Sequence, residues 1–325
     1  MKLFITGGAG FIGYNFLLYW LQHNPEDTLT VYDKLTHVSN KKAIKQLTDE
    51  QPNVSLVIAD ILDYPTLKEA MIGHDLVIHF AAESHVDDSL LDPGLFMRVN
   101  GEGSLNVFHA ALENKVSRVH YVSTDEVFGE FTGDLFTEKT PITPRNPYSA
   151  AKAGAGHMAM AYFNTYGLPV SISNAVNTYG PFQYPNKLIP KFIMNAITDK
   201  KLPVYGDGKQ TREWLYVEDH CRGIDTIIKN GKPGERYILG SGVIKENIEI
   251  VQLILELAHK DETIIEHVED RLGHDRSYQA DSTRLRGLGW EPQVDFDTRF
   301  KETFEWYKNN YALWPEFENI HTSSN

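Results

Sequence analysis

Short apolar runs alternate with longer amphipathic stretches through the first half of the chain. The apolar runs, rich in Val, Ile and Leu, predict buried strands at Lys2–Thr6, Thr28–Asp33, Val54–Asp60, Asp75–Ala82, Val116–Ser123 and Pro169–Ser173. Helical patterns fall between them, most clearly at Gly94–Asn114 and Tyr148–Tyr166. Strands alternating with helices are typical of an α/β protein with a doubly wound parallel sheet, the Rossmann arrangement.

The pattern loosens after residue 173. Connections rich in Pro and Gly, such as 201–208, separate a few helices that include Asn247–His259 and Thr298–Asn309. We therefore predict a Rossmann domain over residues 1–173 and a smaller C-terminal substrate lobe over residues 174–325. We expect the lobe to be interleaved with the first domain, with later segments returning to it.

Charge and cysteine content narrow the functional classes. The 325 residues carry a formal charge of −13, which argues against nucleic-acid binding because that function needs clustered cations. The single cysteine, Cys221, excludes an intramolecular disulfide and favours a reducing cytoplasm. We expect Cys221 to be a small buried side chain. No secretory signal opens the chain and the apolar runs are too short to span a membrane, so we expect no membrane association. No metal site is expected.

A glycine-rich turn connects the first predicted strand to its helix. Gly7-Gly8-Ala9-Gly10-Phe11-Ile12-Gly13 lets the backbone approach a pyrophosphate, and the helix N-terminus adds partial positive charge. Asp33 ends the second strand, where a carboxylate binds ribose hydroxyls and repels a 2′-phosphate, which favours NAD over NADP. Lys34 beside it weakens that preference. The candidate cofactor contacts are Gly7, Gly10, Phe11, Ile12, Gly13, Asp33, Lys34, Asp60, Ile61, Ala81, Tyr148 and Lys152.

A candidate reaction centre follows the fifth predicted strand. Tyr148 and Lys152 are four residues apart and share one helix face. A neighbouring ammonium and a positive nicotinamide ring favour the tyrosine phenolate, so Tyr148 can act as a base in alcohol oxidation. Thr124 would hydrogen-bond the hydroxyl that is oxidised, and Lys152 would hold the cofactor ribose. Oxidation alone does not need the two adjacent carboxyls of Asp125 and Glu126. Removal of water from the oxidised product does, because one group must take a carbon-bound proton and another must protonate the leaving hydroxyl.

These strings resemble a known family. Thr124-Asp125-Glu126-Val127, Tyr148-x-x-x-Lys152 and 81–87 (Ala-Ala-Glu-Ser-His-Val-Asp) are similar to motifs of the extended short-chain dehydrogenase/reductases. The match is narrower for the dTDP-glucose 4,6-dehydratase family and extends over residues 1–310. The resemblance implies an NAD-dependent lyase. Tyr148 would take the C4 hydroxyl proton, Glu126 the C5 proton, and Asp125 would protonate the departing C6 hydroxyl.

The resemblance also implies a nucleotide-sugar substrate, a place in deoxysugar supply for polysaccharide assembly, and a homodimer. The residues that match substrate-binding positions are Glu83, Ser84, Asn177, Lys187, Leu188, Pro203, Tyr205, Arg212, Asn247, Arg271 and His274. The dimer would form through the helices predicted at Gly94–Asn114 and Tyr148–Tyr166. The side chains of Met158, Met160, Tyr162 and Phe163 fit either a partner helix or the chain's own core.

The chain departs from the family pattern at Asp88, Thr178, Glu213, Ile238 and Ser277. None of these removes a catalytic group, but several lie in the substrate half, so the nucleotide could be uridine or cytidine instead of thymidine. A nucleotide-sugar 4-epimerase shares the fold, the cofactor and the tyrosine–lysine pair, but has no use for the two carboxyls. A non-catalytic NAD-binding regulator has no need of any of these catalytic groups.

Overall fold

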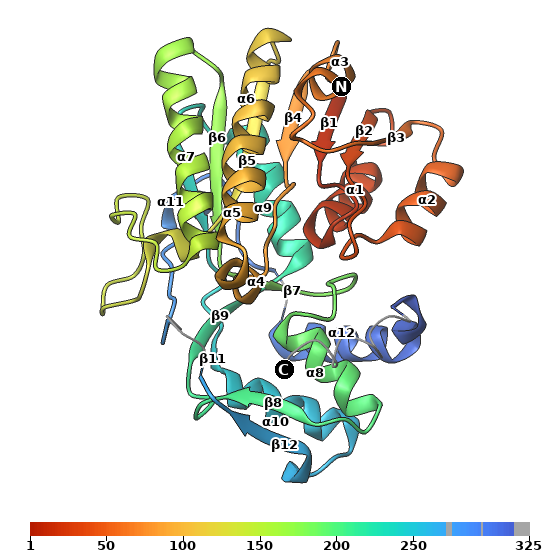
Figure 1. Ribbon diagram of the computed structural model, residues 1–325, viewed down its shortest axis with the longest axis vertical. Coiled ribbons are helices and arrows are strands. Elements are labelled where there is room, and N and C mark those ends of the chain that lie inside the picture. The colour runs from red at the N-terminus through yellow and green to blue at the C-terminus, as the bar shows by residue number, and fades with distance from the viewer. Residues whose placement is uncertain (271–274, 294, 315–325) are drawn as a thin grey trace.

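A parallel sheet forms the centre of the larger, upper part of the molecule in Figure 1. The computed structural model describes residues 1–270, 275–293 and 295–314. Among these residues, seven parallel strands pair in the order β10-β6-β5-β4-β1-β2-β3. They are β1 (Lys2–Thr6), β2 (Thr28–Asp33), β3 (Val54–Ile58), β4 (Leu76–His79), β5 (Arg118–Thr124), β6 (Val170–Ala175) and β10 (Arg236–Leu239). The predicted doubly wound α/β fold is confirmed.

Helices cover both faces of this sheet, so its central strands are buried on both sides. Their side chains are mainly apolar, with buried polar ones such as His120 and Ser173 among them. One apolar core joins the sheet to α3, α6 and α7, and a second joins the other face to α1, α2 and α9. The helical segments of this part are α1 (Phe11–His23), α2 (Lys41–Glu50), α3 (Tyr64–Ala70), α4 (Val86–Leu91), α5 (Pro93–Phe96), η1 (Met97–Gly103), α6 (Ser104–Glu113), η2 (Asp125–Phe128), α7 (Pro147–Tyr166), α9 (Val217–Asn230) and α11 (Thr283–Arg286). Cys221 is fully buried in α9, as expected.

The predicted strand boundaries are correct for β1 and β2 and wrong by two to three residues at the ends of β3 and β4. Beyond β3, the Asp60 carboxylate accepts a hydrogen bond from the backbone of Leu62, which turns the chain away. Beyond β4, the backbone N–H of Ala81 points to the Thr6 side chain at 3.4 Å instead of to a strand partner. Both chain segments therefore leave the sheet at its carboxyl edge, where ligands bind in open α/β sheets.

The helix predicted at Gly94–Asn114 contains a widened π-helical segment, η1, that the sequence did not indicate. Asn100 lies within it, and its side chain forms two hydrogen bonds with the backbone of Glu83, each 2.9 Å long. Single π segments inside helices are frequently found at functional sites. Here the segment allows a buried amide to hold the loop that follows β4.

A smaller lobe lies below the sheet in Figure 1. Its core joins α8, α10, α12 and β8. Strands β11, β9 and β7 form one small sheet, and β12 pairs with β8 in another. Its elements are β7 (Asn177–Tyr179), α8 (Leu188–Ile197), β8 (Leu202–Tyr205), β9 (Thr211–Tyr216), β11 (Ile244–Glu246), α10 (Asn247–Ala258), η3 (Glu262–Ile264), β12 (Ile265–Val268), α12 (Phe296–Asn310) and η4 (Tyr311–Leu313).

The chain crosses between the two parts several times. Strand β7 and helix α8 belong to the lobe. Further along the chain, α9 packs against α1, and β10 pairs with β6 in the large sheet. The division into residues 1–173 and 174–325 stays a prediction. Strand β10, from the second range, is part of the large sheet. None of the helices in the described residues combines the length and the apolar character that a bilayer crossing requires.

Candidate functional site

The glycine turn after β1 is packed too closely for side chains. A Cβ atom on Gly7 would lie 2.5 Å from the backbone nitrogen of Ala81, and its φ of +72° also favours glycine. A Cβ atom on Gly13 would lie 2.3 Å from the carbonyl oxygen of Gly7. The turn is therefore shaped by backbone alone, and the first turn of α1, which begins at Phe11, carries no acidic residue. This is a suitable environment for a phosphate group.

Asp33 joins the end of β2 to this turn. Its carboxylate accepts hydrogen bonds from the backbone N–H groups of Ala9 at 2.9 Å and Leu35 at 2.8 Å. Burial raises the pKa of Asp33, and these backbone hydrogen bonds act against that rise. Lys34 forms an ion pair with Asp60 at 2.8 Å. The Lys34 charge is therefore compensated by Asp60 within the protein. Lys34 is thus a weaker argument for the 2′-phosphate of NADP than its position beside Asp33 suggested.

The two candidate carboxyls lie where β5 ends. Thr124 caps the short helical segment η2, accepting a hydrogen bond from the backbone N–H of Glu126 at 3.2 Å. The Thr124 hydroxyl also donates to Asp125 at 3.2 Å. Asp125 is 2% exposed and its second carboxyl oxygen has no hydrogen-bond partner among the described residues. A buried carboxyl with a free oxygen at the edge of the sheet is available to a ligand.

Helix α7 places the tyrosine and the lysine beside them. It begins at Pro147, and Asn146 caps it by accepting a hydrogen bond from the backbone N–H of Ser149 at 2.8 Å. Tyr148 and Lys152 are both buried one turn apart on its inner face. The Lys152 ammonium donates to the carbonyl oxygen of Val122 at 2.8 Å.

Burial dominates the electrostatics of these groups. It raises the pKa of Asp125 well above its usual value, and the negative charges of Glu126 and Glu213 raise it further, so Asp125 favours the protonated form. A protonated carboxyl is the form that donates a proton to a leaving group. Burial also lowers the pKa of Lys152 to about 7.

Tyr148 differs from the expectation. Burial, followed by electrostatic interactions with Glu126, Tyr121 and Asp125, raises the pKa of its phenol well above the usual value. The sequence predicted the opposite direction from the Lys152 ammonium together with a bound, positively charged nicotinamide ring. Without a bound nicotinamide, burial and the nearby acids outweigh the lysine, whose ammonium lies against Val122 and the Tyr121 ring.

Three of the predicted substrate residues lie together on the lobe. Asn177 is on β7, Arg212 is on the neighbouring β9, and Asn247 begins α10 with its backbone N–H bonded to Gln210. The side-chain carbonyl oxygens of Asn177 and Asn247 are buried without hydrogen-bond partners among the described residues. The Arg212 charge lowers the pKa of Asp125, so this cluster acts electrostatically on the reaction centre.

Other predicted substrate residues line the boundary between the two parts. The Lys187 ammonium donates to the backbone carbonyl of Ser84 at 2.5 Å, and Leu188 follows as the first residue of α8. The Tyr205 hydroxyl donates to Asp87 at 3.3 Å. Predicted contacts are thus placed on both sides of one boundary. Burial raises the pKa of Glu83 in the loop that Asn100 holds. Pro203, another predicted substrate residue, lies on β8. Ile61, a predicted cofactor residue, packs against Gly103. Arg271 and His274 lie outside the described residues.

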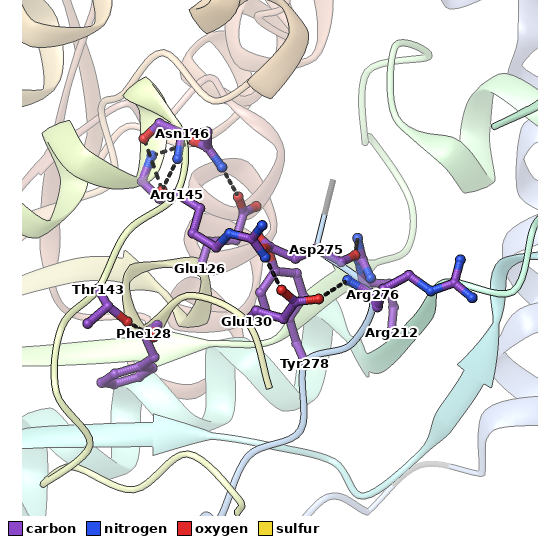
Figure 2. A network of polar contacts seen from close by, with 11 residues as sticks. Glu126, Phe128, Glu130, Thr143, Arg145, Asn146, Arg212, Asp275, Arg276 and Tyr278 are labelled. Atoms are coloured by element: carbon purple, nitrogen blue, oxygen red, sulfur yellow. Dashed lines mark hydrogen bonds and ion pairs between the residues drawn. The ribbon is translucent and has the colours of Figure 1, made fainter. Parts of the chain in front are cut away.

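Sequence reasoning missed a polar network around Glu126 (Figure 2). Arg145 forms ion pairs with Asp275, at 2.9 Å, and with Glu130. The Tyr278 hydroxyl donates to Asp275, and the Arg212 guanidinium lies over the Tyr278 ring, 4.7 Å from its centroid. The network therefore ties the start of α7 to the candidate substrate cation Arg212. Only the Asn-Pro pair at 146–147, a common helix start, could have indicated part of it.

Comparison with known proteins adds three findings. The family model described as GDP-mannose 4,6 dehydratase matches residues 4–303. The chain is 43% identical to the low-salt glycan biosynthesis protein Agl12 of Haloferax volcanii, over 94% of this chain and 98% of that protein. It is 40% identical to dTDP-glucose 4,6-dehydratase 1 of Escherichia coli strain K12, over 95% and 93%.

A solved structure agrees closely with the fold. The crystal structure of DesIV, a dTDP-glucose 4,6-dehydratase from Streptomyces venezuelae with NAD and TDP bound, matches with a TM-score of 0.95. The two chains are 40% identical, and the match covers 98% of this chain and all of that one.

Proposed function

The chain belongs to the GDP-mannose 4,6-dehydratase family, and we propose that it is a dTDP-glucose 4,6-dehydratase. The reaction oxidises the sugar at C4, removes water across C5 and C6, and reduces C6, giving dTDP-4-dehydro-6-deoxyglucose. The proposal draws support from relatives of that name at about 40% identity over nearly their full length. It also draws support from a buried acid and a second carboxyl beside Tyr148.

The residues present fit NAD. The glycine turn leaves backbone room for the pyrophosphate, Asp33 would accept from the ribose, and Ile61 and Ala81 border the same edge of the sheet. NAD would take the C4 hydride and return it to C6, so it is regenerated in each turnover. Lys152, which is buried with an ammonium already near its point of deprotonation, would hold the nicotinamide ribose.

The protein side chains would then move the protons. Tyr148 takes the proton of the C4 hydroxyl, whose oxygen would form a hydrogen bond with Thr124. The new C4 ketone acidifies the C5 hydrogen, and Glu126 removes it as a proton. Asp125, whose pKa burial raises, gives its proton to the C6 hydroxyl, which departs as water. Glu126 returns a proton to C5 when C6 is reduced, which restores Glu126. The proton that Tyr148 took from the C4 hydroxyl passes to solvent, and Asp125 takes up a proton in place of the one it gave to the leaving water.

The observation that carries this proposal is the state of Asp125. A 4-epimerase needs only the tyrosine and the cofactor, whereas elimination of water needs a separate acid. Asp125 is buried, one of its carboxyl oxygens has no hydrogen-bond partner in the part of the chain that the structure describes, and its pKa is raised by burial and by two neighbouring carboxylates. Burying a carboxyl without a full set of hydrogen-bond partners costs stability, and a non-catalytic regulator gains nothing in return.

The test is product analysis with three substrates. Purified protein, with no NAD added, is incubated separately with dTDP-glucose, UDP-glucose and CDP-glucose, and the products are weighed by mass spectrometry. We expect loss of one water from dTDP-glucose alone. Loss of water from another nucleotide sugar only would contradict the thymidine assignment and leave the reaction standing, and an unchanged mass in all three would contradict both.

The family resemblance also leads us to propose a cytoplasmic homodimer. Leu91, Met97 and Met158 are exposed apolar side chains on or beside the helices concerned, at 85%, 60% and 38%. Tyr162 instead packs into the chain's own core, together with partly buried Met160 and Phe163. Sedimentation should give twice the mass of the 36.9 kDa chain. A Met97→Asp variant should sediment as a monomer, and an unchanged mass in that variant would place the contact elsewhere.

A further inference from the structure

Asn146 makes contacts on two sides at the start of α7. Its side-chain oxygen accepts from the backbone N–H of Ser149 at 2.8 Å, and its own backbone N–H is 3.3 Å from the Ser149 hydroxyl. Its side-chain nitrogen donates to the Glu126 carboxylate at 3.4 Å. The capping bond requires the oxygen to face Ser149, so the amide nitrogen is the atom that faces Glu126. Figure 2 shows this contact above the Arg145 network.

The cap fixes the direction of the amide. Asn146 is buried, and Pro147 follows it with a restricted backbone. The side chain therefore has little freedom to turn away from Glu126. The contact joins two segments 20 residues apart, one carrying Glu126 and the other carrying Tyr148.

The chemistry of the donor suits a base. The Glu126 charge acts unfavourably on Asp125 and on Tyr148, raising the pKa of each. A cation in the place of Asn146 would form an ion pair with Glu126 and weaken it as a proton acceptor. A neutral amide instead orients the carboxylate with a single hydrogen bond and leaves its charge in place.

We infer that Asn146 is a positioning residue for Glu126, fixing the direction in which that carboxylate approaches the C5 hydrogen. This inference rests on the proposed dehydration. It adds a function to the helix cap: the residue that starts α7, and so places Tyr148, also sets the orientation of the elimination base. One side chain thereby positions both the base for oxidation at C4, Tyr148, and the base for proton removal at C5, Glu126.

Two substitutions separate positioning from capping. Asn146→Ser retains a side-chain oxygen that caps the helix and loses the amide donor. Asn146→Asp also retains the cap and places a carboxylate oxygen opposite Glu126. Three quantities are measured for each: the midpoint of thermal unfolding, the rate of C4 oxidation from the absorbance of the reduced nicotinamide, and the rate at which C5 takes up deuterium from heavy water.

We expect unchanged thermal midpoints and C4 oxidation within about twofold of the unsubstituted protein. Uptake of deuterium at C5 should fall about tenfold in Asn146→Ser, the effect of one hydrogen bond to a charged group, and further in Asn146→Asp. Equal losses in both partial reactions would show that Asn146 only caps the helix and would overturn the inference. Unchanged deuterium uptake would overturn it as well.

The failure of the inference is distinguishable from failure of the proposed function. If the unsubstituted protein releases no water from any of the three nucleotide hexoses, the proposed function falls. Crystal structures of the protein and of Asn146→Ser then decide the positioning role. A Glu126 carboxylate that points in a different direction in Asn146→Ser than in the unsubstituted protein supports the positioning role. A carboxylate with the same orientation in both structures overturns it.

Discussion

Replacing Glu126 with Gln is expected to stop dehydration while leaving oxidation at C4 in place. Gln has nearly the same shape and its amide oxygen can still accept from Asn146, so the local structure should persist. It cannot take the C5 proton. We expect the rates of dehydration and of C5 deuterium uptake to fall roughly a hundredfold or more, the usual effect of losing a positioned base.

The Glu126→Gln protein should accumulate the absorbance of reduced nicotinamide after mixing with substrate, since the hydride removed from C4 has no acceptor at C6. A matched control is Glu130→Gln, which changes a carboxylate in the following loop that contacts Arg145. We expect that control to retain dehydration within about tenfold. Full dehydration by Glu126→Gln would show that another group is the base.

Replacing Tyr148 with Phe is expected to stop the first chemical step. The ring keeps its edge contact with Phe96, whose centroid is 6.3 Å away, so packing should change little. Without the hydroxyl there is no base for the C4 hydroxyl proton, and we expect the rate of C4 oxidation to fall roughly a hundredfold or more. No absorbance of reduced nicotinamide should appear, in contrast to Glu126→Gln.

The control for this substitution lies on the same helix. Tyr162→Phe removes a hydroxyl that lies 3.3 Å from His109, away from the carboxyls. Its activity should match that of the unsubstituted protein. If reduced nicotinamide builds up in Tyr148→Phe at the normal rate, a different group takes the C4 hydroxyl proton. That result would contradict the role of Tyr148 as the base.

The direction of the Tyr148 pKa bears on this prediction. Burial, and after it the interaction with Glu126, raises this pKa in the free protein, so the unsubstituted enzyme has to form the phenolate when a positively charged nicotinamide is bound nearby. The sequence placed the tyrosine and lysine correctly on one helix face, but it could not give the depth at which they lie. Depth decides the sign of the shift here.

The features that the sequence predicted correctly depend on local patterns. Apolar runs located β1 and β2 to the residue, and the glycine spacing located the turn whose backbone leaves no room for side chains. Order along the chain then placed Asp125 and Glu126 at the carboxyl edge of the sheet. These inferences need only the rule that consecutive parallel strands end on the same side.

The features that the sequence missed depend on contacts between distant segments. Arg145 meets Asp275 across 130 positions, and Asn100 holds the backbone of Glu83 through a π-helical turn. No periodicity marks such pairs, because each is set by the packing of whole elements. The Asn146 cap could be predicted from the Asn-Pro pair, but its second bond to Glu126 could not.

The departures from the family pattern have local partners. Glu213 accepts from the backbone N–H groups of Gly242 and Ala280, at 2.7 and 2.9 Å. Ser277 accepts from the Thr211 hydroxyl at 2.7 Å, and Thr178 lies 2.9 Å from His220. Asp88 contacts His85 at 3.1 Å, and Ile238 is buried in an apolar cluster. Each of these residues therefore has contacts within the chain itself.

Transfer of the C4 hydrogen to C6 tests the central claim most directly. dTDP-glucose carrying deuterium at C4 is incubated with purified protein without added NAD, and the product is examined by mass spectrometry and NMR. We predict a product lighter by one water, with the deuterium in the C6 methyl group. Deuterium retained at C4 of an epimer, or lost to solvent without loss of water, would contradict an internal redox dehydration.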